Sequence, residues 1–355
     1  MQLGEEHRLI GDAAQSLLSE TAGLERLRAV VEDPSGWDAP LWSAMAQDMG
    51  LIGLMIPDIH GGAGLDAAAM ALVLEETGRR LAVVPFFETA VLGVQSLLMA
   101  GDDDQQAALL PGVASGDQRM TVAGLAARPH LDNQRLSGVA DHVSFAHVAD
   151  ALIVFADDGR ILHVPSDAPG LTIIRTPGLD PTRPLSRVVF DVAAADLTVL
   201  SQGSQAAQDR IRLLGAGLLA AEQTGAAAFC LEATVAYGRD RIQFGRAIAS
   251  FQAVKHMLAE MMVRIEASRS AVLYAVTAID RNLELEDACA VAASWATETL
   301  QKCAADQIQL HGGVGFTWEH HAHLYFKRAR SSASWLTSPS SHREMIAARL
   351  FGDAA

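Results

Sequence analysis

The sequence has little of three features that mark particular classes of protein. Its three cysteines, Cys230, Cys289 and Cys303, show no CxxC spacing, which favours a reduced, cytoplasmic chain over a disulfide scaffold. The opening residues, MQLGEEHRLIGD, lack the basic and apolar segments of a secretion signal. No uninterrupted apolar run reaches the ~18 residues that a membrane span needs. We therefore expect a cytoplasmic protein without membrane insertion.

Positive charge is also scarce. There are 27 Lys and Arg residues against 42 Asp and Glu, which gives a net charge of −15. Such a balance argues against a nucleic-acid partner or an anionic membrane surface. The net charge does not exclude binding of a small anionic ligand, because such binding depends on the electrostatic potential at the site and not on the total charge.

What is present is a folded, mainly helical chain. Half of its residues are apolar, and only 5% are aromatic. Residues 1–118 predict helices with short loops, and 119–205 contain β-branched runs such as LIVFA and RVVFDV between turn signals. Residues 206–355 return to a helical period, with a long helix expected from Leu285 to His311. We predict an α+β fold with an N-terminal helical domain, a small antiparallel β domain and a C-terminal helical bundle.

Two segments suggest ligand binding. YGRDRIQFGRAIASFQ (237–252) places Arg241 before an amide, an aromatic residue and a glycine, and arginine pairs well with a pyrophosphate. QLHGGVGFTWE (309–319) ends a helix in adjacent glycines, which expose backbone groups to a ligand. Each segment also has a simpler interpretation. The first is also explained by an interhelix turn with a solvated arginine, and the second by a helix stop.

Together these segments resemble the acyl-CoA dehydrogenase family. Arg-x-Gln-Phe-Gly followed by Phe-Gln, and then Gln-x-His-Gly-Gly-x-Gly-Phe, are similar to its signature. In the N-terminal part, MGLIGLMIPDIHGGAG (49–64) and LVLEETGRRLAVVP (72–85) resemble the family's first domain. The match runs in order over nearly the whole chain, and the β region is its least similar third. The resemblance implies a C-terminal four-helix bundle, FAD as cofactor and an acyl-CoA substrate.

In that family FAD lies between the β domain and the bundle and reaches a neighbouring subunit. Carried over by position, the residues that would contact the FAD pyrophosphate from across a dimer are Arg241, Gln243 and Phe244. The residues that would hold the other end of the cofactor are Gln309, Gly312 and Gly313, with Gln252 a further candidate. The resemblance therefore implies an oligomer, because one complete site needs two chains.

The β domain carries the expected contact with the flavin ring. The segment LSGVADHVS aligns with a family segment that ends in Trp-Ile-Thr or Trp-Ile-Ser. By that alignment Ser144 would face flavin N5, and His142 replaces the usual Trp. The family's Thr-Glu-Pro and Gly-Ser-Asp at the start of this domain are replaced by VAGLAARPH (122–130).

The catalytic base of the family is missing from both of its usual positions. The reaction removes an α proton with a carboxylate while flavin N5 accepts the β hydride. The late position of that Glu aligns with Leu336, and the early position aligns with Gly215. Glu222 and Glu319 are the remaining candidates for a displaced base, although an acidic first turn also explains Glu319.

Two functions remain open on this basis. The first is an FAD-dependent acyl-CoA dehydrogenase that acts directly with a displaced base. The second is a non-catalytic partner subunit that completes the FAD site of a heteromeric, steroid-type enzyme. The resemblance further implies an electron-transfer flavoprotein as acceptor, and either a homo-oligomer or a heterotetramer with a base-carrying paralogue.

Other sites find less support in the sequence. EHHAH (319–323) lacks the His-x-x-x-His or Glu-x-x-His spacing of metal ligands, so we expect no metal. The glycines of GAGLLA (215–220) fit a dinucleotide pattern, but DRIRLL before them is helical in period and not a buried strand. We interpret this stretch as part of one long helix.

Overall fold

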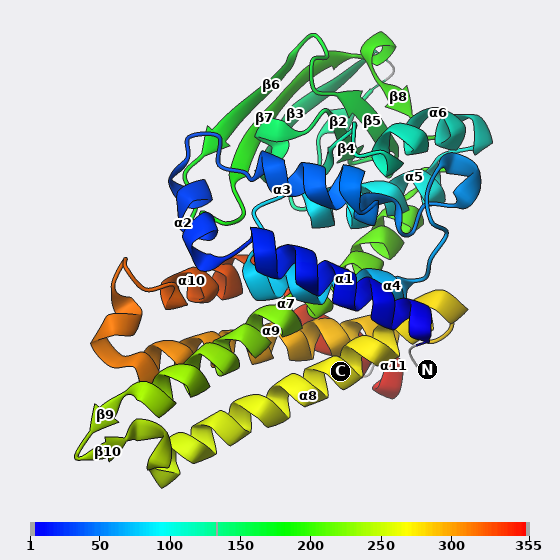
Figure 1. The fold of residues 1–355 in the computed structure, drawn as a ribbon. Helices are drawn as coiled ribbons and strands as arrows, with labels where there is room; N and C mark the ends of the chain where they lie inside the picture. Colours follow the sequence, from blue (N-terminus) through cyan, green and yellow to red (C-terminus); the bar gives the residue numbers. More distant parts are fainter. Residues whose placement is uncertain (1–3, 133, 353–355) are drawn as a thin grey trace. The chain divides into compact units, whose positions relative to one another are not determined.

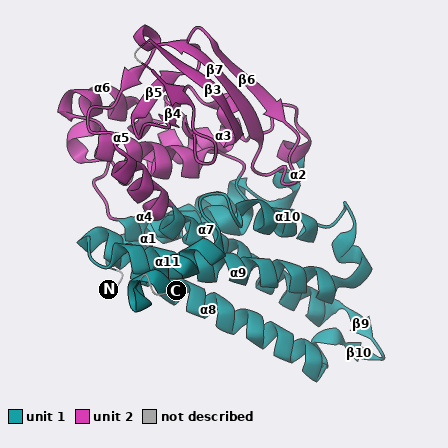
Figure 2. Ribbon diagram, turned by 180° about the vertical axis from the view of Figure 1, so that it is seen from behind, with its two compact units in different colours: residues 1–29, 67–82, 216–355 teal, residues 30–66, 83–215 magenta. Residues whose placement is uncertain are grey.

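The computed structural model describes residues 4–132 and 134–352, which form two compact units (Figure 1). Unit 1 consists of residues 1–29, 67–82 and 216–355 (Figure 2). Unit 2 consists of residues 30–66 and 83–215. The order of helices, a small β domain and long helices confirms the predicted α+β class.

Unit 1 is helical. Its helices are α1 (Glu5–Thr21), the start of α2 (Leu24–Glu32), α4 (Ala67–Arg80), most of α7 (Gln205–Asp240), α8 (Gln252–Arg281), α9 (Leu285–His311), α10 (Ala322–Ser332) and α11 (Pro339–Phe351). Shorter elements are the strands β9 (Ile242–Gln243) and β10 (Arg246–Ala247) and the 3-10 turns η7 (Ile248–Ser250) and η8 (Gly312–Phe316).

The end of α9 is the one that the sequence predicted. The helix runs from Leu285 to His311, and Gly312 then takes φ 64° and ψ −142°. Only glycine adopts this combination without strain, so the helix cannot continue past it. Helix α7 likewise runs unbroken through Gly215 and Gly217, which confirms the interpretation against a dinucleotide turn.

Helices α4 and α7 cross in close contact at two glycines. A Cβ on Gly78 would lie 1.9 Å from the carbonyl oxygen of Glu222, and one on Gly225 would lie 1.8 Å from that of Glu75. Each glycine therefore faces the backbone of the other helix. No larger residue fits at either position without separating the helices.

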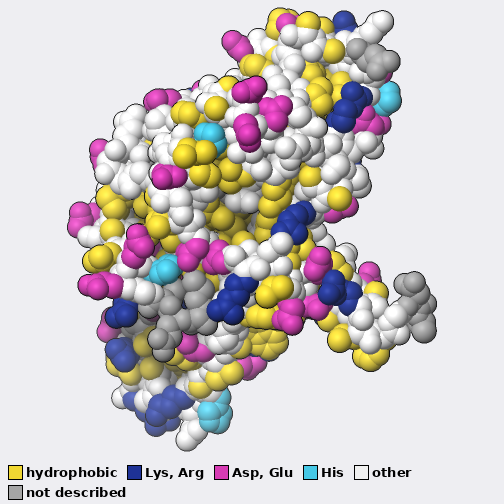
Figure 3. All heavy atoms as spheres, turned by 90° about the vertical axis from the view of Figure 1, so that its right-hand side faces the viewer, with side chains coloured by type: hydrophobic (Ala, Val, Ile, Leu, Met, Phe, Trp, Pro, Cys, Tyr) yellow, Lys and Arg dark blue, Asp and Glu magenta, His cyan; other side chains and the backbone are white. Residues whose placement is uncertain are grey.

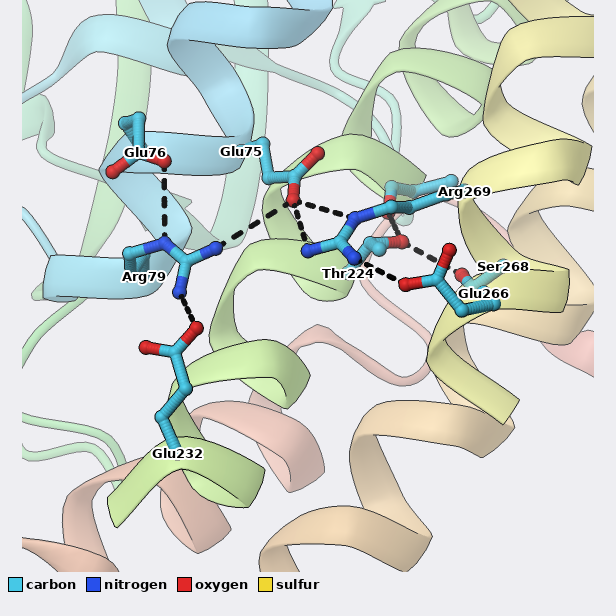
Figure 4. Close-up of polar contacts among 9 residues, drawn as sticks. Glu75, Glu76, Arg79, Thr224, Glu232, Glu266, Ser268 and Arg269 are labelled. Atoms are coloured by element: carbon cyan, nitrogen blue, oxygen red, sulfur yellow. Dashed lines mark hydrogen bonds and ion pairs between the residues drawn. The ribbon is translucent and has the colours of Figure 1, made fainter. Parts of the chain in front are cut away.

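Ion pairs surround this crossing (Figure 4). The Arg269 guanidinium on α8 donates to Glu75 of α4 at 3.0 and 2.9 Å. Arg79 of α4 donates to Glu76 at 3.2 Å and to Glu232 of α7 at 2.5 Å. Both arginines therefore connect α4 to a long C-terminal helix.

Unit 2 contains two four-stranded sheets. One has the order β1 (Met120–Ala123), β4 (Ala151–Phe155), β5 (Ile161–Pro165), β8 (Thr198–Val199). The other has the order β2 (His130–Leu131), β3 (Arg135–Ser144), β7 (Leu185–Ala193), β6 (Leu171–Thr176). Buried side chains from both sheets, among them Leu152, Leu162, Leu136 and Phe190, form one hydrophobic cluster.

The remaining elements of unit 2 are short helices. They are α3 (Ala39–Ser43), α5 (Val94–Ala100) and α6 (Asp103–Ala114), the π-helical η1 (Ala44–Asp48) and η4 (Phe87–Gly93), and the 3-10 turns η2 (Leu51–Gly53), η3 (Asp58–His60), η5 (Ala146–Val148) and η6 (Ala194–Asp196). Within the predicted helical region, residues 39–53 are thus divided among an α-helix, a π turn and a 3-10 turn.

The sequence predicted an antiparallel β domain, but one pair of strands in this region is parallel. Strands β1 and β4 pair in parallel, with Met120 opposite Ala151 and Ala123 opposite Val154. A parallel pair needs a long crossover, and residues 124–150 supply it with β2, β3 and η5. The turn signals between the β-branched runs do not distinguish such a crossover from a hairpin.

One helix in the described part of the chain, α7, is long and apolar enough to cross a membrane. Its mean hydropathy over the relevant window is 1.2, and 89% of that window is buried inside the structure. This burial is typical of the core helix of a globular protein.

Candidate functional site

The two signature segments come together at one end of unit 1. The Tyr237 hydroxyl near the end of α7 donates to the His311 carbonyl at the end of α9, at 3.3 Å. The rings of these two residues also stack, with centroids 4.3 Å apart. The hairpin that carries Arg241, Gln243 and Phe244 therefore begins beside the turn that carries Gly312 and Gly313.

The hairpin β9–β10 presents an exposed aromatic residue in a strained conformation. Phe244 has φ 54° and Gly245 has φ 79°, so both central residues of this two-residue turn are left-handed. Phe244 is 91% exposed. A bulky residue with positive φ costs free energy, and such residues concentrate at functional sites. Arg241 and Gln243 beside it are also exposed.

The glycine turn after α9 leaves room for a ligand against the backbone. A Cβ built on Gly245, Gly312 or Gly313 meets no heavy atom within 4 Å. Gln309, one turn earlier on α9, is exposed. Open backbone, an exposed guanidinium and exposed amides fit a pyrophosphate and its neighbouring groups. Gln252 is the first residue of α8 and is also exposed.

A series of ring contacts continues from the end of α9 beside the glycine turn. The ring centroids of His311 and His320 are 4.5 Å apart, those of His320 and His321 are 4.3 Å apart, and those of His321 and Phe229 are 5.3 Å apart. Burial and the neighbouring imidazoles lower the pKa of His320 to about 4 and that of His321 to about 3. These histidines are therefore neutral near pH 7 and act as packing groups. Among the described residues, no three His, Cys, Asp or Glu side chains are grouped to hold a metal ion.

In unit 2, Ser144 lies in an irregular part of strand β3. The pairing of β3 with β7 shifts register between Ala140 and Val143, which is a β-bulge. His142 and Phe145 on either side of Ser144 have φ 60° and 52°. Ser144 is 2% exposed, so its orientation is set by the surrounding structure.

The two positions that the family resemblance predicts for the catalytic base hold no titratable group. Leu336 is 2% exposed, and Gly215 lies in the buried part of α7. Glu222 is committed elsewhere, because its carboxylate accepts a hydrogen bond from buried Arg328 at 2.8 Å. Glu319 is exposed, and hydrogen bonds from its own backbone N–H and from the Thr317 side chain lower its pKa.

Sequence reasoning missed the partner of Glu222 and the surroundings of Ser144. Arg328 lies 106 residues from Glu222 along the chain. The backbone carbonyl of Ser144 accepts a hydrogen bond from Thr121, which is buried on strand β1. Neither contact has a local signal, because both are made between distant segments.

Comparisons with known proteins identify the family of the chain. Residues 4–117 match the family model of the acyl-CoA dehydrogenase N-terminal domain, and residues 202–351 match that of the C-terminal domain. Acyl-CoA dehydrogenase IpdE2 of Mycobacterium tuberculosis is 36% identical over 345 residues, which cover 94% of this chain and 94% of IpdE2.

Two solved structures are similar over nearly their full length. A variant of the steroid ACAD Tcur3481–Tcur3483 has a TM-score of 0.88 and 32% identity, and the match covers 98% of this chain and 99% of that one. The ChsE4–ChsE5 complex from Mycobacterium tuberculosis has a TM-score of 0.89 and 26% identity, and the match covers 100% of this chain and 99% of that one.

Proposed function

This chain belongs to the acyl-CoA dehydrogenase family, whose cofactor is FAD, and we propose that it serves as the subunit without a catalytic base in a heteromeric enzyme. The observation that carries the proposal is that neither position predicted for the catalytic base holds a carboxylate. Leu336 and Gly215 occupy both base positions, and Arg328 holds Glu222. Glu319 is exposed to solvent and its pKa is lowered, so its carboxylate is a weaker base than an ordinary Glu.

In this proposal the chain contributes binding groups. When bound, FAD supplies the hydride acceptor at flavin N5. Arg241 would pair with the pyrophosphate, and the open backbone at Gly312 and Gly313 would admit the adenine end of the cofactor. Ser144 would lie against the flavin ring. A partner subunit would bind the acyl-CoA substrate and supply the carboxylate that removes its α proton.

The similar structures support a mixed assembly. One is named for a pair of proteins, Tcur3481–Tcur3483, and another for a complex of ChsE4 with ChsE5. We carry this over as a heteromer of the present chain with a base-carrying paralogue. The first of these structures is a steroid ACAD, which favours a steroid-derived acyl-CoA as substrate of the assembly. We further propose an electron-transfer flavoprotein as its electron acceptor and the cytoplasm as its location.

The surface charge agrees with a soluble enzyme partner and not with a nucleic acid. On the face shown in Figure 3, Asp and Glu side chains are spread among the described residues, and Lys and Arg stand in separate small groups. With a net charge of −15, the protein would repel the negatively charged phosphate backbone of a nucleic acid.

The proposal is tested on the chain purified alone and again after co-expression with a base-carrying paralogue. In each sample the visible flavin spectrum is recorded, and steroid-type and straight-chain acyl-CoAs are then added without oxygen. We expect bleaching of the flavin only in the co-expressed complex. Yellow protein that bleaches when the chain is alone would overturn the proposal and establish direct dehydrogenation by this chain.

A second measurement separates loss of base from loss of fold. A complex in which the paralogue's Glu is replaced by Gln should keep its flavin and its mass but fail to bleach. If that complex still bleaches, the base resides in the present chain, and Glu319→Gln and Glu222→Gln become the variants to examine.

A further inference from the structure

A buried ion pair in unit 2 has no role in the function described so far. Glu88 lies on the π-helical turn η4, and Arg183 lies in the loop between β6 and β7. The Nε atom of Arg183 is 3.5 Å from Oε1 of Glu88, and the two side chains are 6% and 1% exposed. Burying two charges gains little stability over an apolar pair of similar volume. Such a pair therefore fits a role in fixing geometry better than a role in stability alone.

The residue after Glu88 connects η4 to strand β1. The Thr89 hydroxyl donates to the Met120 carbonyl at 2.9 Å and accepts from the Met120 N–H at 3.0 Å. The next residue, Thr121, donates its hydroxyl to the carbonyl of Ser144 at 2.6 Å. Thr89 and Thr121 are both fully buried, so water does not compete for these bonds.

The residue after Arg183 reaches the same place from the other side. The Pro184 carbonyl accepts a hydrogen bond from the N–H of Phe145 at 2.9 Å. The Ser144 carbonyl and the Phe145 N–H belong to one peptide group. Thr121 therefore holds one edge of this peptide plane, and Pro184 holds the opposite edge.

The orientation of this peptide determines both the position of Ser144 and the left-handed conformation of Phe145. Phe145 has φ 52° and is 1% exposed, and a bulky residue adopts this conformation only where its surroundings impose it. Rotation of the Ser144–Phe145 peptide would relieve the strain and break both hydrogen bonds, which would leave the backbone at Ser144 free to shift. The two hydrogen bonds oppose that rotation, and the Glu88–Arg183 pair holds the segments that supply them.

We propose that Glu88, Arg183 and Thr121 are positioning residues that lock the Ser144–Phe145 peptide and thereby hold Ser144 against the flavin ring. The inference rests on the proposed function in one respect, the contact of Ser144 with flavin. The lock itself is a property of unit 2 and can be measured without any cofactor.

The sharpest variant is Thr121→Val, which removes one hydroxyl and keeps the shape of the side chain. Thr121→Ser restores the hydroxyl and is the conservative rescue. Thr224→Val is the matched control, because Thr224 is 1% exposed and its hydroxyl hydrogen-bonds Ser268 within unit 1, whereas the lock belongs to unit 2. All three are compared in the FAD-loaded protein, which is the complex with its paralogue if the chain needs one.

Two readouts are taken on each variant. The first is hydrogen exchange of the peptide that contains Phe145, and the second is the FAD dissociation constant together with the visible spectrum and potential of the bound flavin. We expect Thr121→Val to expose the Phe145 amide, shift the flavin spectrum and weaken FAD binding about tenfold, the effect of one lost hydrogen bond. Thr121→Ser and Thr224→Val should match the parent in both readouts.

The outcomes separate the lock from the function. Unchanged exchange in Thr121→Val overturns the lock. Faster hydrogen exchange at Phe145 with unchanged FAD affinity and flavin spectrum overturns the positioning role. A hydrogen bond that only stabilises the fold would give this result. If no sample takes up FAD, the proposed function fails while exchange still tests the lock. Glu88→Gln and Arg183→Met should each increase exchange at Phe145, and their effects should not add in the double variant.

Discussion

Glu222 and Arg328 form a deeply buried ion pair in unit 1, with side chains 6% and 2% exposed. Because each charge depends on the other, loss of either one leaves an uncompensated charge in the interior. We expect Glu222→Leu and Arg328→Met each to lower the free energy of unfolding by about 3–5 kcal/mol. The measurement is urea denaturation followed by circular dichroism.

The double variant Glu222→Leu/Arg328→Met provides the control. It replaces both charges with apolar groups, so its loss should be smaller than that of either single variant. If the double variant loses the sum of the two single effects, the pair is not coupled. Glu222 would then regain interest as a catalytic carboxylate.

Arg241 offers a second test at the level of a single residue. Its exposed guanidinium beside the strained turn at Phe244 is proposed to pair with the pyrophosphate of FAD. A hydrogen bond to a charged group contributes about 1.5–3 kcal/mol, so Arg241→Ala should weaken FAD binding roughly 10- to 100-fold. Titration of the apoprotein complex with FAD measures this change.

The matched control for that variant is Arg239→Ala, two residues earlier at the exposed end of α7. It removes the same charge close to the same place. Equal losses of affinity in the two variants would indicate a general electrostatic effect and would argue against a specific contact at Arg241.

At the scale of elements, the crossing of α4 and α7 depends on backbone contact. A Cβ on Gly225 would lie 1.8 Å from the carbonyl oxygen of Glu75. Gly225→Ala must therefore move the helices apart, and we expect it to destabilise unit 1 by about 1–3 kcal/mol. Thermal and urea unfolding both report this loss.

Gly11→Ala in helix α1 is the informative counterpart. The nearest heavy atom to a Cβ at Gly11 is 3.6 Å away, in Leu72, so a methyl group fits there. Alanine favours a helix over glycine, and this variant should gain about 0.5–1 kcal/mol. Similar behaviour of the two variants would show that the crossing tolerates separation.

At the scale of the whole molecule, partly buried histidines contribute to the response to acid. His320 and His321 have folded pKa values of about 4 and about 3, below their ordinary value of 6.5. The unfolded chain therefore binds more protons than the folded one between about pH 6.5 and pH 4. Their contribution to stability is present above pH 6.5 and is lost as the pH falls through this window.

We expect the urea midpoint to be lower at pH 5.0 than at pH 7.5, and His321→Phe to reduce that difference. Phenylalanine keeps the edge-on ring contact with Phe229 and has no proton to bind. The same substitution at exposed His256 is the control and should leave the pH dependence as it is in the parent. An unaltered difference in His321→Phe would contradict the assignment to the stacked histidines.

Much of the fold followed from local pattern. The end of α9 at His311 was predictable because Gly312 adopts backbone angles that other residues avoid. The long helix through Gly215 was predictable from its period and from the charged residues before it. The parallel pairing of β1 with β4 was not, because strand direction depends on how residues 124–150 return the chain.

The sequence by itself determined the family, the cofactor and the segments that carry the cofactor motifs, since these are written in consecutive residues with strict spacing. Only the tertiary structure decided that the Glu222 carboxylate is paired with an arginine and that the Ser144 carbonyl accepts a hydrogen bond from a buried threonine. Arg328 meets Glu222 across 106 residues, and Thr121 meets Ser144 across 23. Such contacts depend on three-dimensional packing, because a hydrogen bond forms between atoms about 3 Å apart whatever their separation along the chain.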